Sequence, residues 1–185
     1  MKIAIVKLSA LGDIVHTMIV LQFIKKYNQE IKIDWIVEEK YKELLELNPD
    51  IDNIHAVNFR KAKKKKSLFL LLSELKKVRS FGPYDLVVDF QGLIKSGLVS
   101  LLIPSPVTLG FDKFSIRESI ASFCYNKTFH YGYDKNVIER NIALMEFGLG
   151  LNFNKQNIKN KATFLYSRQK YLMPELSKIK KNILI

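Results

Sequence analysis

The chain contains almost no cysteine, and this scarcity excludes a disulfide framework. Cys124 is the one cysteine among 185 residues, so no disulfide can form within the chain, as is typical of proteins from a reducing compartment. The histidines, His16, His55 and His130, show no spacing typical of metal ligands. The sequence therefore assigns no residue to a structural or catalytic metal.

Long apolar runs are also missing. After Met1 and Lys2, four apolar residues precede Lys7, which is too short a run for the apolar core of a secretory signal. The longest apolar run, Leu68 to Leu72, falls well below the roughly 20 residues that a membrane-spanning helix needs. We therefore expect a cytoplasmic protein that is peripheral to the inner face of a membrane at most.

Acidic residues are scarce relative to basic ones. The chain has 18 Asp and Glu against 30 Lys and Arg, which gives a formal net charge of +12 at pH 7. This imbalance favours an anionic partner, which could be a nucleic acid, a phosphorylated small molecule or an anionic membrane surface. The hydrophobic fraction of 48% is that of a globular protein, and the length suffices for one well-buried domain.

The glycine-rich motifs G-x-G-x-x-G and G-x-x-x-x-G-K-[ST] are absent, so neither a dinucleotide fingerprint nor a P-loop is supported. Instead, strand and helix patterns alternate along the chain. The predicted strands cover residues 2–7, 31–37, 54–57, 85–89 and 107–110, and the predicted helices cover 14–27, 39–47, 67–79, 93–102, 115–125 and 136–148. Such alternation predicts an α/β domain with a Rossmann-like doubly wound parallel sheet.

The predicted domain ends near Gly150. Residues 152–161 are polar and read as a linker, after which 162–166 predict a strand and 168–178 a helical segment. The last residues, 180–185, repeat the opening pattern of a basic residue before an apolar run. We therefore expect a domain over 1–150, and a linker with the start of a second, truncated α/β domain over 151–185.

The turn after the first predicted strand gathers residues suited to chemistry. Ligands of open α/β sheets bind at the carboxyl ends of strands, and Lys7, Ser9, Gly12 and Asp13 lie there. Asp13 could act as a general base on a substrate hydroxyl, although on spacing alone a helix cap is the simpler interpretation. Lys7 and Ser9 could bind phosphate or stabilise a developing anion, or serve as a solvated strand end and a turn residue.

Two other segments could add to this site. Six cations occupy the seven positions from Arg60 to Lys66, after the third predicted strand. This run is a solvated charge run or, at the predicted ligand edge, a site for a multiply charged anion. Few aromatic residues interleave it, which argues against nucleic acid. After the fourth predicted strand, Asp89 and Gln91 could bind sugar hydroxyls or satisfy their own turn.

Taken in order, these segments resemble the bacterial lipopolysaccharide heptosyltransferases of glycosyltransferase family 9. The opening Lys-x-Ser-x-x-Gly-Asp-x-x-His-Thr carries the resemblance, which extends to about residue 150. Further matching segments are residues 34–39, 89–96, 117–118, 121–126 and 139–140. The resemblance implies a GT-B fold of two Rossmann-like domains, with the acceptor bound by the N-terminal domain and ADP-heptose by the C-terminal one.

The resemblance also implies an activity. It is the inverting transfer of L-glycero-D-manno-heptose from ADP-heptose to the Kdo of Kdo-lipid A, in synthesis of the lipopolysaccharide inner core. Asp13 is then the catalytic base, Lys7 binds the donor or stabilises an anion, and the remaining donor residues lie beyond Ile185, so this chain alone lacks the donor site. The implied acceptor-binding residues are Ser9, Gly12, Arg60, Lys61, Lys63, Lys64, Gln91 and Arg117.

The expected partners are Kdo-lipid A, ADP-heptose and the anionic inner face of the inner membrane. We expect a monomer that needs no cofactor and binds no nucleic acid; a role for a divalent metal stays open. One alternative is a sister enzyme that adds the second heptose. An alternative from another class is a non-catalytic module that binds polyanions through residues 60–66.

Overall fold

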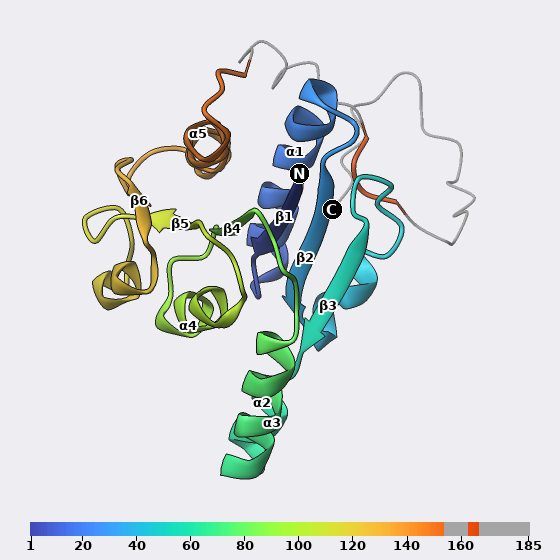
Figure 1. Ribbon diagram of the computed structural model, residues 1–185, viewed down its shortest axis with the longest axis vertical. Coiled ribbons are helices and arrows are strands. Elements are labelled where there is room, and N and C mark those ends of the chain that lie inside the picture. The colour runs from blue at the N-terminus through green and yellow to red at the C-terminus, as the bar shows by residue number, and fades with distance from the viewer. Residues whose placement is uncertain (154–162, 167–185) are drawn as a thin grey trace, which may run out of the picture.

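The first strand, β1 (Lys2–Val6), lies at the centre of a parallel sheet and is buried on both faces (Figure 1). Ile3 and Ile5 point into one hydrophobic cluster, and Ala4 and Val6 point into another on the opposite face. This alternation follows from the two-residue period of a strand. The computed structural model describes residues 1–153 and 163–166.

The sheet is six-stranded and every pair of neighbouring strands is parallel. Its strands are β1, β2 (Lys32–Glu38), β3 (Asn53–Val57), β4 (Leu86–Asp89), β5 (Thr108–Phe111) and β6 (Lys127–Phe129). Their order is β3-β2-β1-β4-β5-β6, which confirms the predicted doubly wound sheet. The order reverses between β1 and β4, and ligands of such sheets bind at this point of reversal.

Helices cover both faces of the sheet. On one face α1 (Leu11–Tyr27) and α5 (Val137–Leu149) pack together, and on the other α3 (Leu68–Arg79) and α4 (Ile94–Leu102) bury residues such as Val78 and Val99. Shorter helical segments are η1 (Glu39–Leu44), α2 (Phe59–Lys64) and η2 (Ser119–Cys124). None of the helices in the described part of the chain has the length and apolar character needed to cross a bilayer.

Several predicted boundaries were wrong. Helix α1 begins at Leu11. Asp13 is therefore the third residue of this helix, and the capping position before the helix is Ala10. The helix expected over 115–125 shrinks to a 3₁₀ segment, η2, and the edge strand β6 was missed because three residues carry no measurable periodicity. Part of the cation run is helical, as α2.

The strand predicted over 162–166 is also wrong for the residues of this range that the structure describes. Residues 163–166 lie outside any strand. Phe164 packs against the core cluster, and its carbonyl accepts a hydrogen bond of 3.0 Å from the Asn48 side chain. One partly buried side chain, Phe164, and this hydrogen bond therefore anchor the segment without a strand ladder. The segments expected over 168–178 and 183–185 lie outside the described residues.

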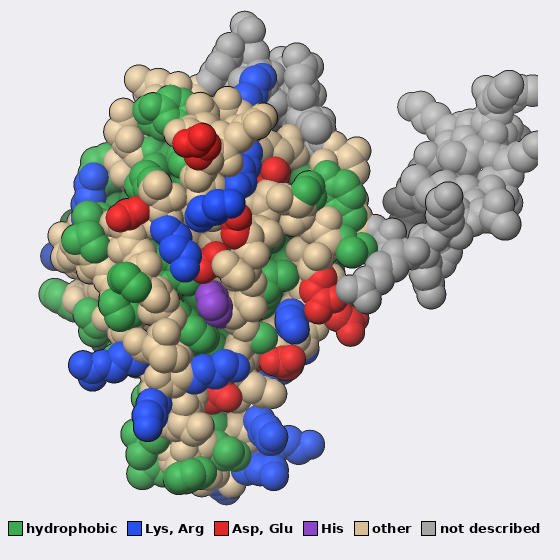
Figure 2. Space-filling view, turned by 45° about the vertical axis from the view of Figure 1, so that its right-hand side comes forward, with side chains coloured by type: hydrophobic (Ala, Val, Ile, Leu, Met, Phe, Trp, Pro, Cys, Tyr) green, Lys and Arg blue, Asp and Glu red, His purple; other side chains and the backbone are tan. Residues whose placement is uncertain are grey.

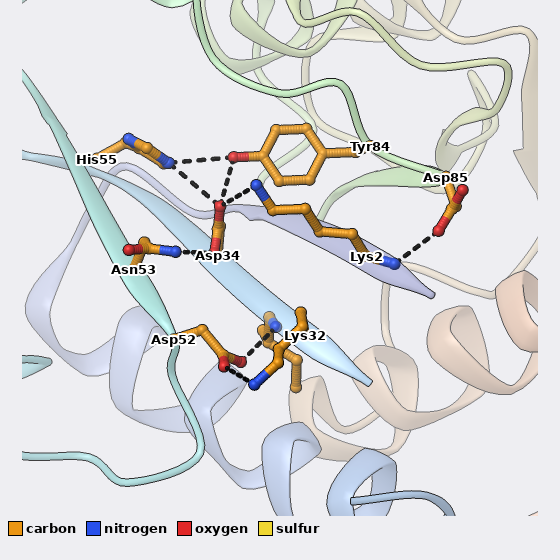
Figure 3. Close-up of polar contacts among 9 residues, drawn as sticks. Lys2, Lys32, Asp34, Asp52, Asn53, His55, Tyr84 and Asp85 are labelled. Atoms are coloured by element: carbon orange, nitrogen blue, oxygen red, sulfur yellow. Dashed lines mark hydrogen bonds and ion pairs between the residues drawn. The ribbon is translucent and has the colours of Figure 1, made fainter. Parts of the chain in front are cut away.

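A polar cluster ties the strands together at the amino edge of the sheet (Figure 3). Asp34, at 1% exposure, accepts hydrogen bonds from Tyr84 Oη at 2.8 Å and Asn53 Nδ2 at 2.9 Å. Its Oδ2 also lies 3.0 Å from Lys2 Nζ and 3.3 Å from His55 Nε2. Burial pushes the pKa of Asp34 upward, but these four partners outweigh it and hold the pKa below its usual value.

Candidate active site

A cavity of about 500 Å³ opens at the carboxyl edge of the sheet, where the strand order reverses. Five residues that the sequence singled out line it, from turns far apart in the chain: Lys7, Ser9, Asp13, Gln91 and Arg117. The turns after β1 and β4 lie next to each other because these two strands are parallel neighbours, so their carboxyl ends lie side by side.

Asp13 lies in the first turn of α1, with an exposed side chain that lines the cavity. Its Oδ2 accepts a hydrogen bond from the backbone N–H of Ala10 at 3.4 Å. This contact is long for a hydrogen bond, so the capping interaction is weak. The carboxylate touches the helix terminus and also lines the cavity, so its position is compatible with both interpretations of Asp13.

Lys7 is not a solvated strand end, because its side chain is 5% exposed. Its ammonium group donates a hydrogen bond of 3.1 Å to the carbonyl of Phe90 and lines the cavity. Burial lowers the pKa of Lys7, and the charges of Asp13 and Asp89 offset part of this effect. A buried cation with a single carbonyl partner is well suited to an anionic ligand, whose charge would compensate for lost hydration.

Gln91 holds the first turn in place. Its Oε1 accepts hydrogen bonds from the backbone N–H groups of Leu8 at 2.8 Å and Ser9 at 3.2 Å, and its Nε2 donates to Ser9 Oγ at 3.4 Å. Because these bonds join residues 82 or more positions apart, they lock the ends of β1 and β4 together. Gln91 still lines the cavity, so its amide can both support the turn and border a ligand.

The Asp89 side chain hydrogen-bonds within its own turn, which is one of the two roles considered from the sequence. The side chain is fully buried; its Oδ1 accepts from the backbone N–H of Gln91 at 2.7 Å, and its Oδ2 accepts from Tyr125 Oη at 2.8 Å. Burial raises the pKa of Asp89 despite these bonds. With no access to the cavity, Asp89 positions the Gln91 turn and does not meet a ligand.

Sequence reasoning assigned no role to Arg140, although its guanidinium borders the cavity. Arg140 is 8% exposed, donates to the carbonyls of Tyr133 at 3.0 Å and Ser115 at 2.5 Å, and lies 4.7 Å from the Phe111 ring centroid. It thus fastens α5 to the segment that carries the exposed Arg117. The motif Glu139-Arg140 was part of the resemblance, but its contacts depend on residues far away in the sequence.

The basic run and Gly12 do not line this cavity in the described part of the chain. Arg60, Lys61, Lys63 and Lys64 border a second cavity of about 620 Å³, together with Asn58, after β3. Strand β3 lies two positions from β1 in the sheet, so the run shares the edge of Asp13 but has its own recess. Gly12 is exposed beside the first cavity, and a Cβ there would meet no atom within 4 Å.

The electrostatics of the first cavity favour an anionic ligand. One carboxylate, Asp13, shares its lining with the cations Lys7, Arg117, Lys135 and Arg140. Among residues 1–153 and 163–166, no group of three or more His, Cys, Asp or Glu is arranged to hold a metal ion. The lining therefore offers cations to an anionic ligand beside a carboxylate, Asp13.

A doubly wound sheet with a cationic crevice and a carboxylate at its point of reversal defines a Rossmann-like domain whose crevice is suited to an anionic ligand. The profile of glycosyltransferase family 9 (heptosyltransferase) matches residues 72–185. The chain belongs to this family, as its motifs indicated.

Curated relatives agree with this assignment. Lipopolysaccharide heptosyltransferase 1 of Campylobacter coli is 40% identical over 190 residues, covering 100% of this chain and 54% of the relative. The protein of the same name from Escherichia coli (strain K12) is 31% identical over 153 residues, covering 81% of this chain and 48% of the relative. The chain thus spans about half the length of the curated relatives it matches.

Solved structures confirm the fold class as half of a GT-B enzyme. The E. coli heptosyltransferase WaaC with ADP-2-deoxy-2-fluoro heptose superposes with a TM-score of 0.77 at 31% identity, covering 84% of this chain and 50% of WaaC. E. coli ADP-heptose lps heptosyltransferase II has a TM-score of 0.58 at 22% identity, with 78% of this chain and 40% of that one covered. Because the sequence identity is only 22%, the likeness to heptosyltransferase II is evidence for the fold alone.

Proposed function

We propose that the full-length protein transfers L-glycero-D-manno-heptose from ADP-heptose to the Kdo of Kdo-lipid A, with inversion at the anomeric carbon. The observation that carries this proposal is the carboxylate of Asp13, which faces a cavity otherwise bordered by cations. The names of the relatives support it, since two of them are lipopolysaccharide heptosyltransferases 1. The WaaC structure contains a fluorinated analogue of ADP-heptose, which supports the donor.

In this reaction Asp13 removes the proton from the acceptor hydroxyl as its oxygen attacks the anomeric carbon of the donor. The new C–O bond forms on the face opposite the departing ADP, so the configuration inverts. The bond that breaks joins the anomeric carbon to the phosphate oxygen, and ADP keeps its electron pair. Lys7, buried beside Asp13, compensates for negative charge in the cavity.

The acceptor would contact both recesses of the carboxyl edge. Arg117, Ser9 and Gln91 border the cavity of Asp13, where they would hold the reacting sugar. Arg60, Lys61, Lys63 and Lys64 border the second recess, and Gly12 keeps the first turn of α1 open to the acceptor. Carboxylates and phosphates of the acceptor would pair with the cations of both recesses.

The proposed division of labour follows the fold. Residues 1–150 would bind the acceptor, and residues 151–185 would form a linker and the start of a second domain that binds ADP-heptose. A lipid-linked acceptor would keep the protein at the inner face of the inner membrane. We propose that the protein acts as a monomer.

Acceptor preference tests the proposal directly. Purified full-length protein is incubated with ADP-heptose and either Kdo-lipid A or the same acceptor already carrying one heptose, and the products are weighed by mass spectrometry. We expect one heptose to be added to Kdo-lipid A. Transfer confined to the heptosylated acceptor would instead assign the second addition. Heparin binding without transfer to either acceptor would indicate a non-catalytic polyanion-binding module.

A further inference from the structure

Helix α3 presents large apolar side chains to solvent at the carboxyl edge of the sheet. Leu68 is 68% exposed, Phe69 is 80% exposed and Leu72 is 57% exposed. Exposed apolar residues are ordinary when they are scattered, but a contiguous group indicates an interaction surface. These three lie within one and a half turns of the same helix, and Leu68 lines a groove together with the exposed Leu98 of α4.

An apolar groove of about 610 Å³ runs between this helix, α2 and α4. Its floor is formed by Phe59, Leu71, Leu75 and Val99, and lysines stand at its rim. The rim lysines are Lys63, Lys66 and Lys95. The surface thus combines an apolar centre with a cationic border. We call the exposed faces of α3 and α4, together with this groove, the α3–α4 surface.

The charge around the α3–α4 surface is predominantly positive. From Asn53 to Tyr84 the chain carries nine Lys and Arg side chains and one carboxylate, Glu74. That carboxylate accepts a hydrogen bond of 3.0 Å from the backbone N–H of Asn58. Figure 2 shows Lys and Arg side chains around the lower lobe of the molecule, where hydrophobic side chains also gather. An anionic partner is therefore favoured.

We propose that the α3–α4 surface docks on an anionic lipid bilayer, with Leu68, Phe69 and Leu72 entering the interface and the surrounding lysines meeting lipid headgroups. Stable attachment to a bilayer takes two weak signals, an inserted apolar face and a basic patch, and both are present here. A nucleic acid could pair its phosphates with the lysines, but it would leave the apolar side chains exposed to solvent. The occupant that uses both features is the bilayer.

This docking also orients the candidate active site. Lys95, at the rim of the groove, forms an ion pair with Glu38 at 2.5 Å, and the backbone N–H of Glu38 donates to the Leu8 carbonyl at 3.2 Å. The α3–α4 surface and the turn that carries Asp13 are thus joined along one sheet edge. The benefit of this orientation for a lipid-linked acceptor rests on the proposed function, whereas binding to a bilayer does not.

Flotation with lipid vesicles tests the docking. The full-length protein is mixed with vesicles of phosphatidylcholine, with or without phosphatidylglycerol, at low and high salt. The test variants are Phe69→Glu and the uncharged Phe69→Ser. The matched control is Tyr27→Glu, which changes an aromatic residue of similar exposure, 59%, at the end of α1 near the amino edge. Melting temperatures verify that each variant is folded.

We expect the unaltered protein and Tyr27→Glu to float with the anionic vesicles, less so at high salt. Phe69→Glu should weaken partitioning by about ten-fold, and Phe69→Ser by about three-fold or more, because less apolar surface enters the interface. Absence of binding by the unaltered protein, or equal binding by Phe69→Glu and Tyr27→Glu, would overturn the proposal.

Transfer assays separate this proposal from the proposed function. With a detergent-dispersed acceptor, Phe69→Glu should turn over at the rate of the unaltered protein, and with acceptor embedded in vesicles it should be slower. If no acceptor is ever modified while anionic vesicles still bind through Phe69, the proposed function fails and the docking surface stands. If transfer is normal in every format, including vesicles, the docking surface fails and the proposed function stands.

Discussion

Asp13 and Lys7 face the same cavity, but the chain holds them in different ways. Asp13 is exposed in the first turn of a helix, with a long contact to a backbone N–H. Lys7 is buried and hydrogen-bonded to a carbonyl. The exposed carboxylate is therefore placed to meet a bound hydroxyl, and the buried ammonium group is placed to meet an anion.

Replacing Asp13 by Asn tests the role of the base. Because the amide cannot accept the proton of the acceptor, kcat should fall by roughly 10²- to 10⁴-fold. The Michaelis constants for both substrates should change little, and the melting temperature should stay within a few degrees. Steady-state kinetics of the full-length enzyme provide the measurement. A variant that retains most of its turnover would refute the catalytic role.

In the polar cluster at the amino edge, Asp34→Asn should make the free energy of unfolding depend less on pH in the acidic range. The folded-state pKa of Asp34 is lowered, so its contribution is present above the unfolded value of about 3.9 and is lost as the pH falls through the folded pKa. At pH 7 the variant should lose about 3 kcal/mol of unfolding free energy.

Urea denaturation at several pH values from neutral to strongly acidic measures the effect. The gap between the unaltered protein and Asp34→Asn should narrow below about pH 4. The control is Asp134→Asn, because the Asp134 side chain is 76% exposed and should contribute little at any pH. A gap that is independent of pH would contradict the assignment of this stability to an ionised Asp34.

Among the elements, strands with an apolar run follow their sequence patterns, and the short strand β6 and segment η2 do not. The apolar runs within β1, β2 and β4 predicted these strands to within a residue or two, although β2 also carries charged residues. The edge strand β6 and the 3₁₀ segment η2 are short and partly exposed. Their conformation depends on neighbouring elements more than on their own pattern.

The turn between β4 and α4 should be intolerant of a side chain at Gly92. This residue has φ +66°, and an added Cβ would collide with Ile116. We expect Gly92→Ala to lose about 1–3 kcal/mol of unfolding free energy. Gly12→Ala is the matched control, since its Cβ meets open space in a helix and should be neutral or slightly stabilising. Equal urea midpoints for the two variants would contradict this reasoning.

On the scale of the whole molecule, two cationic recesses share one edge of the sheet. The recess beside Asp13 lies over β1 and β4, and that of Lys61 and Lys63 follows β3. An extended acceptor with several negative groups is proposed to contact both. This separation predicts that the basic cluster contributes to acceptor binding without touching the reacting centre.

Lys61→Ala combined with Lys63→Ala should raise the Michaelis constant for the acceptor by about ten-fold and leave that for ADP-heptose unchanged. The effect should shrink at high salt, because exposed charges are screened. The control is Lys40→Ala combined with Lys42→Ala on η1, which removes the same charge from a segment after β2 that borders neither recess in the described structure. Equal acceptor constants for the two double variants would identify the basic run as a solvated charge cluster.

The sequence by itself determined the α/β class, the central strands and the polar turn after β1, because hydrophobic period and turn composition are local properties. It also carried enough motifs to indicate the family. Only the tertiary structure decided which residues share a cavity. The order β3-β2-β1-β4 sets the cation run apart from Asp13, and distant packing brings Arg140 beside it. Such proximity depends on strand order and on long-range burial, which a local pattern does not encode.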